Sequence, residues 1–140
     1  MVVVLDTNHF TALVAGGPLS LGLSHRATER DTDLFTTIVT AQEVMQGWLA
    51  ALNRERAGSD QLTAYRRFHR ALKDLQKITV LPFDQEGAGV FHRLQSQRIR
   101  IGTMDLKIAS ICIAHDATLL TRNLVDFEKV PGLRVENWLD

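Results

Sequence analysis

Four acidic residues in this chain are placed so that they could act together on a metal ion. They are Asp6, Glu43, Asp105 and Asp126. Carboxylates gathered within a few ångströms repel one another, which raises their pKa values. A bound divalent cation reverses that effect, and Mg²⁺ and Mn²⁺ prefer oxygen ligands of this kind. Such ions activate water and stabilise charge at a phosphodiester, so the four acids predict metal-assisted phosphodiester hydrolysis.

Each acid also has a purely structural interpretation. Glu43 stands three residues after Thr40, which is the spacing of a capping box, and Asp105 could offset a helix dipole. Asp126 could form an Asx-turn. Asp6 is the hardest to explain in this way, because a carboxylate directly after a buried strand is costly unless a positive group meets it.

A parallel sheet would bring these acids to one edge. Runs rich in β-branched residues predict strands at 2–5, 34–39, 78–81 and 119–120, with a short fifth at 133–135. The intervening segments predict helices. A turn at Gly16-Gly17-Pro18 and a break near Gly58-Ser59 separate some of them, and Thr40 and Asp84 are expected to be N-caps. The last long helix is expected to begin at Gly102-Thr103.

Strands that alternate with helices predict an α/β fold, with a mostly parallel sheet of four to five strands and helices on both faces. We expect one domain over residues 1–140. Helix N-termini and strand C-termini share one edge of such a sheet, and ligands bind there. The four acids are therefore expected to converge at that edge, with Asp126 in the loop after the fourth strand.

Composition is that of an ordinary globular protein. Hydrophobic residues make up 45% and charged residues 23% of the 140 residues. The 16 Lys and Arg balance the 16 Asp and Glu, so bulk charge does not favour nucleic acid. RNA phosphates would have to be met by local basic groups, and the best placed are Arg98, Arg100, Lys107 and Arg122.

Cysteine and histidine carry little of the predicted chemistry. The single cysteine, Cys112, lies in an apolar run and is expected to be a buried core residue. The five histidines show no zinc-ligand spacing, and only His9, which follows Asp6 closely, is worth testing. No stretch has the length of a signal peptide or a membrane span, so we expect a cytoplasmic protein without membrane contact.

Four short motifs, in order along the chain, resemble those of the PIN domain. They are Leu5-Asp6-Thr7-Asn8, Thr40-Ala41-Gln42-Glu43, Gly102-Thr103-Met104-Asp105 and Thr121-Arg122-Asn123-Leu124-Val125-Asp126-Phe127. The ending Val130-Pro131-Gly132-Leu133-Arg134-Val135-Glu136-Asn137-Trp138 is similar to that of the VapC-type toxins of prokaryotic toxin–antitoxin pairs. Each motif is short, and the resemblance depends on their order and spacing over almost the whole chain.

The resemblance implies a three-layer PIN-like fold and a Mg²⁺- or Mn²⁺-dependent endoribonuclease that cuts tRNA or rRNA. It also implies a VapB-type antitoxin as partner and a homodimer. By the same resemblance the four acids are the catalytic and metal-binding residues, supported by Asn8, Thr121 and Asn123. The fourth acid of the family stands at either the Asn123 or the Asp126 position, and only Asp126 is acidic here.

Two alternatives from other functional classes stay open. Phosphotransfer domains also place a phosphoacceptor aspartate after a hydrophobic strand, although Asn8 stands where a second aspartate is common. A catalytically weak PIN-like binding module would act only through partners, although the complete acid set argues against it. The helical stretch 40–75 is expected to offer a hydrophobic groove to an antitoxin helix or a dimer partner. The alternative is that its apolar residues only pack the core. These residues are Trp48, Leu49, Leu52, Tyr65 and Phe68.

Overall fold

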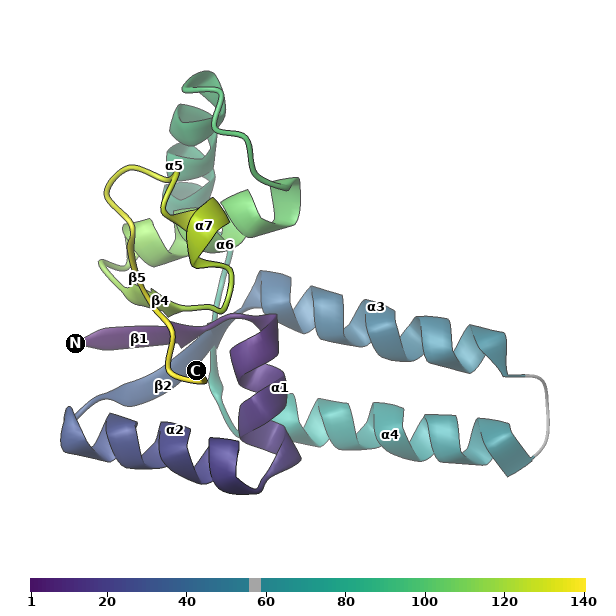
Figure 1. Ribbon diagram of the computed structural model, residues 1–140. Coiled ribbons are helices and arrows are strands. Elements are labelled where there is room, and N and C mark those ends of the chain that lie inside the picture. The colour runs from purple at the N-terminus through teal and green to yellow at the C-terminus, as the bar shows by residue number, and fades with distance from the viewer. Residues whose placement is uncertain (56–58) are drawn as a thin grey trace.

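A five-stranded parallel sheet forms the centre of the computed structural model, which describes residues 1–55 and 59–140 (Figure 1). The strands are β1 (Val2–Leu5), β2 (Asp33–Thr37), β3 (Thr79–Leu81), β4 (Thr118–Leu120) and β5 (Arg134–Glu136), in the spatial order β3-β2-β1-β4-β5. Every neighbouring pair is parallel. The chain runs outward from β1 in both directions, so the carboxyl end of β1 lies where the strand order reverses.

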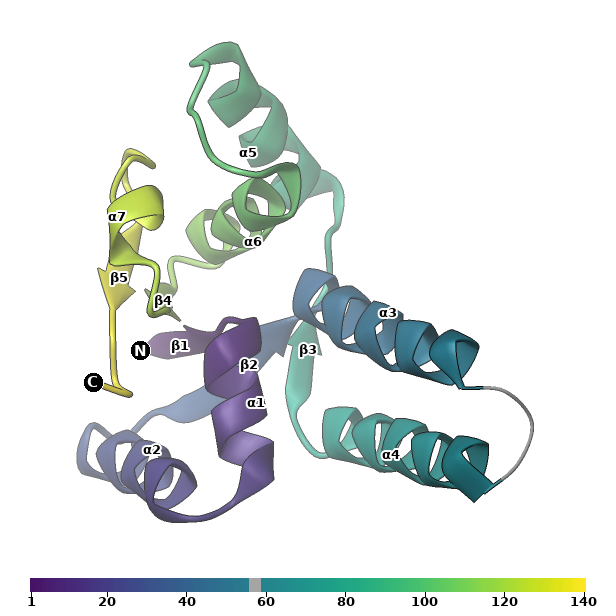
Figure 2. The same ribbon diagram turned by 45° about the vertical axis from the view of Figure 1, so that its right-hand side comes forward.

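Helices cover both faces of the sheet, as the α/β pattern predicts. The helices α1 (Thr7–Ala15) and α2 (Pro18–Glu29) lie on one face, and α5 (Gln85–Ser96) and α6 (Thr103–Ala114) lie on the other (Figures 1 and 2). The short helix α7 (Leu124–Phe127) follows β4. Two long helices, α3 (Ile38–Arg54) and α4 (Ser59–Gln76), pack against each other and extend away from the sheet as an arm.

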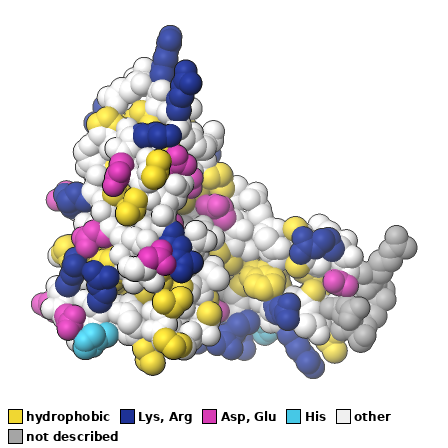
Figure 3. All heavy atoms as spheres, in the orientation of Figure 1, with side chains coloured by type: hydrophobic (Ala, Val, Ile, Leu, Met, Phe, Trp, Pro, Cys, Tyr) yellow, Lys and Arg dark blue, Asp and Glu magenta, His cyan; other side chains and the backbone are white. Residues whose placement is uncertain are grey.

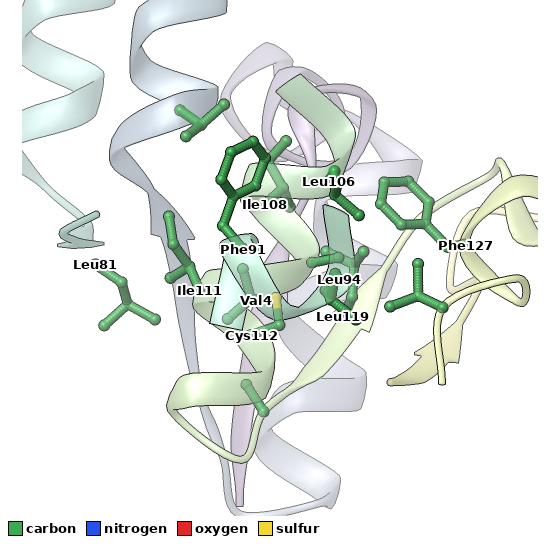
Figure 4. Packing of buried hydrophobic residues seen from close by; sticks show 14 residues of the cluster. Val4, Leu81, Phe91, Leu94, Leu106, Ile108, Ile111, Cys112, Leu119 and Phe127 are labelled. Atoms are coloured by element: carbon green, nitrogen blue, oxygen red, sulfur yellow. The ribbon is translucent and has the colours of Figure 1, made fainter. Parts of the chain in front are cut away.

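Alternation along β1 divides the core into two clusters. Val3 and Leu5 point to the cluster under α1 and α2, whereas Val4 points to the cluster under α5 and α6. Figure 4 shows Val4 packed near Leu119 of β4 and Ile111 of α6. All three β1 residues are fully buried, and burying one such side chain contributes about 1.5–3 kcal/mol. The strand that carries Asp6 is thus fixed from both sides.

The turn between α1 and α2 forms where the sequence predicts it. Gly16 and Gly17 adopt φ angles of 74° and 85°, a region that favours glycine. Pro18 then occupies the first turn of α2, where its missing N–H costs nothing. None of the described helices is both long enough and apolar enough to cross a membrane.

The start of α3 corrects the prediction. The second strand ends at Thr37 instead of residue 39, and α3 begins at Ile38. Thr37 caps the helix, because its Oγ1 accepts the Thr40 N–H at 3.1 Å, so Thr40 is not the N-cap. Glu43 therefore lies beyond the first turn and cannot close the predicted capping box.

Two other boundaries differ from the sequence prediction. Asp126 lies in the one-turn helix α7 instead of a loop. The predicted helix break near Gly58-Ser59 is matched by a new helix that starts at Ser59, while Gly58 itself lies outside the described residues. Asp84 caps α5 as predicted, accepting the Gly87 N–H at 3.1 Å.

Candidate active site at the carboxyl edge of the sheet

Asp6 joins β1 to α1 and is fixed by local hydrogen bonds. It is the N-cap of α1, and its Oδ1 accepts the backbone N–H of His9 at 2.9 Å. The His9 ring nitrogen Nδ1 lies 3.2 Å from the same oxygen. Only 7% of Asp6 is exposed, so its carboxylate is held in one orientation at the edge of the sheet.

Glu43 reaches the same edge from α3. Its Oε1 accepts a hydrogen bond from the Thr7 hydroxyl at 3.2 Å, which ties α3 to the start of α1. Burial raises the pKa of Glu43, and the charges of Asp105 and Asp6 raise it further, while the Thr7 hydrogen bond acts in the opposite direction. The Glu43 carboxylate is therefore half-buried and close to two other acids.

Asp105 completes the cluster from the first turn of α6. Gly102 caps this helix without a side chain, so Asp105 is the acid that faces the helix N-terminus. Burial raises the pKa of Asp105, with further contributions from the charges of Asp6 and Asp126. Within residues 1–55 and 59–140, no Lys or Arg forms an ion pair with Glu43 or Asp105.

Three elements thus bring Asp6, Glu43 and Asp105 to one place, and we call these residues the acid cluster. Its donors are all carboxylate oxygens, the ligand chemistry that Mg²⁺ and Mn²⁺ prefer, and its excess negative charge fits a cation. The described side chains nevertheless include no group of three His, Cys, Asp or Glu arranged to hold a metal ion together. Mg²⁺ does not require such a group, because it usually binds through one or two carboxylates and keeps several waters.

Asp126 lies beside the acid cluster but is held by other partners. Its Oδ2 accepts from the Asn123 amide at 2.9 Å, and its Oδ1 accepts from the Lys129 ammonium at 3.1 Å. These hydrogen bonds, first that of Asn123 and then that of Lys129, lower the pKa of Asp126. Asp126 is near enough for its charge to raise the pKa of Asp105, although both of its oxygens already have donors.

The supporting polar residues have different positions. Thr121 is fully buried and shapes the loop after β4, because its Oγ1 accepts the Asn123 N–H at 2.9 Å. Asn123 in turn holds Asp126, as described above. Asn8 is exposed on the first turn of α1.

The predicted RNA-binding residues do not form one group. Arg98 and Arg100 are exposed in the connection from α5 to α6, and Arg122 forms an ion pair with Asp140 at 3.4 Å beside the loop after β4. Lys107 places its Nζ 5.8 Å from the ring centroids of Phe83 and Phe91. Basic and acidic side chains are interspersed on the face shown in Figure 3, with Lys and Arg at the end of the molecule formed by α5 and its connection to α6.

Sequence reasoning missed three contacts of the site. It did not predict that Thr7 would hold Glu43, or that Lys129 would hold Asp126. The spacing of three residues between Asp126 and Lys129 was an available signal for the second contact. The third is the hydrogen bond from the Trp138 backbone N–H to His9, which joins residues 129 positions apart and has no local signature.

Two curated proteins resemble part of this chain in sequence. A ribonuclease named VapC1 from Rickettsia felis is 44% identical over 62 residues, which are 41% of this chain and 46% of that protein. A tRNA(fMet)-specific endonuclease, VapC from Salmonella typhimurium, is 29% identical over 46% of this chain and 52% of its own length. The chain thus matches about half the length of these curated relatives.

Solved structures extend the likeness to the whole fold. The crystal structure of VapBC2 from Rickettsia felis, bound to a promoter DNA fragment, superposes with a TM-score of 0.76 at 22% identity and covers 99% of both chains. At that identity the likeness shows the fold alone. The model of the PIN domain family matches residues 3–133, and the chain therefore belongs to the PIN domain family.

Proposed function

We propose that this chain is a Mg²⁺- or Mn²⁺-dependent endoribonuclease of the VapC type, which cuts tRNA or rRNA and is neutralised by a VapB-type antitoxin. The acid cluster carries the proposal, because Asp6, Glu43 and Asp105 are close enough to raise the pKa of Glu43 and Asp105, and neither of these two has a Lys or Arg partner among the described residues. Relatives that match this chain over about half of their own length are named as a ribonuclease and an endonuclease, which supports the proposal. When bound, the cation would supply charge for the phosphodiester and activate water.

The residues of the chain have distinct parts in this proposal. Asp6 presents a carboxylate that His9 and the start of α1 hold still. Asp105 offers a second carboxylate from α6, and Glu43 a third whose position is fixed by Thr7. Asp126 would act next to these acids, with its negative charge partly offset by the ion pair with Lys129.

A purified-protein cleavage assay tests the activity. Total tRNA and rRNA are incubated with the protein in EDTA, Mg²⁺ or Mn²⁺, and Asp105→Asn is compared with Glu86→Gln, which removes an exposed acid from the first turn of α5. We expect cleavage only with the divalent ion, and its loss in Asp105→Asn but not in Glu86→Gln. Cleavage that persists in Asp105→Asn would refute the proposal.

Two further outcomes separate the alternatives. Calorimetry that detects no Mn²⁺ binding at millimolar concentration would favour a binding module without catalysis. Labelling of Asp6 by acetyl phosphate would favour the phosphotransfer domain. Either outcome would stand against the ribonuclease, because both reassign the same acid cluster.

The arm of α3 and α4 is the proposed contact for the antitoxin or for a second copy of the chain. Leu49, Leu62 and Tyr65 on this arm are 47%, 54% and 56% exposed, more apolar surface than a solvated helix pair needs. Hydrophobic side chains are visible between the two helices in Figure 3. Leu52 is instead buried, and Trp48 and Phe68 are half-buried, so part of the predicted groove packs the arm itself.

A search for a short reading frame immediately upstream of the gene, followed by its co-expression with this chain, tests this partner. We expect a stable complex whose RNA cleavage is suppressed, and Tyr65→Asp should weaken the complex without lowering the cleavage activity of the free protein. Recovery of the free protein alone, still active in the presence of that upstream product, would contradict the toxin–antitoxin assignment. Light scattering of the free protein tests the proposed homodimer.

A further inference from the structure

Among the residues that the structure describes, His9 is the only histidine that is completely buried. Both ring nitrogens have polar partners: Nδ1 lies 3.2 Å from Oδ1 of Asp6, and Nε2 accepts the backbone N–H of Trp138 at 3.2 Å. A buried imidazole with two such partners sits in a fixed orientation, because turning the ring would leave at least one of them unsatisfied.

The partners decide which nitrogen carries the proton. The Trp138 N–H can only donate, so Nε2 must offer its lone pair. Nδ1 then carries the proton and donates a hydrogen bond to Oδ1 of Asp6. A proton on Nε2 would set two donors against each other inside the core. The surroundings thus select the tautomer with the proton on Nδ1.

This tautomer makes the two oxygens of Asp6 unequal. Oδ1 receives two hydrogen bonds from His9, one from its backbone N–H and one from its ring. Among residues 1–55 and 59–140, no donor contacts Oδ2. The carboxylate is therefore fixed through one oxygen, while the other is left for a ligand.

The Nε2 side of the His9 ring contacts the C-terminal segment that carries Trp138. Trp138 is 6% exposed, and its Nε1 donates to Glu136 at 3.2 Å. Two guanidinium groups, that of Arg26 in α2 and that of Arg30 at its C-cap, lie 4.9 and 5.1 Å from the Trp138 ring centroid. The segment that supplies the N–H to His9 is thus itself anchored to α2.

We propose that His9 is a positioning residue for the acid cluster: its ring, braced by the Trp138 backbone, holds Asp6 through Oδ1 and leaves Oδ2 as the oxygen that would bind the divalent cation. This inference rests on the proposed function for the identity of the ion. A hydrogen-bonded partner of this kind behind a metal-binding group typically contributes about 10–100-fold in metal affinity or activity.

Two substitutions separate the two hydrogen bonds of His9. His9→Phe keeps an aromatic ring in the core but removes both bonds, and we expect Mn²⁺ affinity to fall about 10–100-fold. His9→Asn keeps an N–H donor near the place of Nδ1 and loses the bond to Trp138, so it should recover part of that loss. Ser110→Ala is the matched control, because it removes another fully buried side-chain hydrogen bond, to Leu106 at 2.7 Å.

Calorimetric titration with Mn²⁺ measures the affinity, and the melting temperature in EDTA measures the structural cost. Weakened Mn²⁺ binding in His9→Phe but not in Ser110→Ala, at similar loss of stability, supports positioning. Unchanged Mn²⁺ binding in a folded His9→Phe overturns it. If His9→Phe does not fold, the His9→Asn protein is titrated instead. Mn²⁺ affinity equal to that of the wild type, with RNA cleavage at the same Mn²⁺ concentrations, would overturn the role of the Trp138 hydrogen bond.

The ring itself supplies a readout that needs no metal. The ¹⁵N shifts of the His9 imidazole in the metal-free protein report which nitrogen carries the proton, and we expect Nδ1–H. A ring protonated at Nε2 would overturn the inference whether or not the protein cuts RNA. Conversely, a protein that binds Mn²⁺ through Asp6 in a His9-dependent way but cleaves no RNA would refute the proposed function alone.

Discussion

Neutralising Asp105 should make the metal-free protein more stable while it abolishes activity. Burial, together with the charges of Asp6 and Asp126, raises the pKa of Asp105 above its ordinary value in the folded protein. Between the two pKa values the folded protein binds more protons than the unfolded chain, so its stability falls as the pH rises through that window. At neutral pH the wild type therefore bears the cost of an ionised Asp105, which Asp105→Asn does not.

The size of the effect follows from the position of Asp105. The side chain is half-buried, so solvent screens its repulsion, and we expect a gain of about 0.5–1 kcal/mol in the free energy of unfolding. The interaction of the carboxylate with the α6 N-terminus, worth about 0.3–1 kcal/mol, opposes this gain. It does not reverse the sign, because the pKa is raised on balance. The melting temperature should rise by roughly 2–4 °C.

Thermal and urea unfolding in EDTA at neutral pH measure the gain, and a second series near pH 4 tests its cause. The advantage of Asp105→Asn should shrink in acid, because a larger share of the wild-type Asp105 carboxyl groups is then protonated in the folded protein. Glu86→Gln, the acid in the first turn of α5, serves as the control and should bring no stabilisation. Saturating Mn²⁺ should stabilise the wild type, by about 2.7 kcal/mol at 100 times the Kd, and should stabilise Asp105→Asn less.

The reasoning would be refuted by an Asp105→Asn protein that melts at or below the wild-type temperature in EDTA at neutral pH. That result would mean that the acid cluster is not under electrostatic strain. A gain that persists unchanged in acid would also refute it, because the stabilisation would then come from packing and not from charge.

Three further predictions concern single contacts. Thr37→Ala should lower the free energy of unfolding by about 1 kcal/mol in urea titrations, because the hydroxyl caps α3; an unchanged midpoint would mean that Thr37 is not the cap. Asp126→Asn should reduce the rate of RNA cleavage less than Asp6→Asn does, since the Lys129 ammonium already offsets the charge of Asp126, and equal losses would speak against that ranking. Cys112 should resist thiol reagents until the protein is unfolded, because burial raises the pKa of its thiol, and rapid labelling of the native protein would disprove this.

The fold could be predicted because its signals are local. The run that forms β1 is β-branched and apolar, Gly16 and Gly17 mark the first turn, and Asp84 stands where α5 needs a cap. Each of these depends on a few neighbouring residues. The start of α3 was misplaced because Thr37 and Thr40 are both good N-caps, and only the position at which β2 leaves the sheet decides between them.

The candidate site could be predicted only in part. Parallel topology is enough to bring Asp6, Glu43 and Asp105 to one edge, because that edge is where strands end and helices begin. Topology does not say which groups bind the acids there. The partners of Asp126, Glu43 and His9 depend on side-chain directions in the folded chain, and the Trp138 contact depends on where the end of the chain lies.

Packing of the elements that carry the acids explains how one edge of the sheet can hold several negative charges while the protein stays folded. Asp6 follows a strand that is buried on both faces, and Asp105 lies in the first turn of a helix whose residues Leu106, Ile108 and Ala109 are buried in the core. The apolar burial of a few such side chains contributes several kcal/mol, at about 1.5–3 kcal/mol each, which exceeds the screened repulsion of the acids. The framework is therefore stable enough to keep these partly buried carboxylates near one another, and the proposed cation would relieve the repulsion that remains.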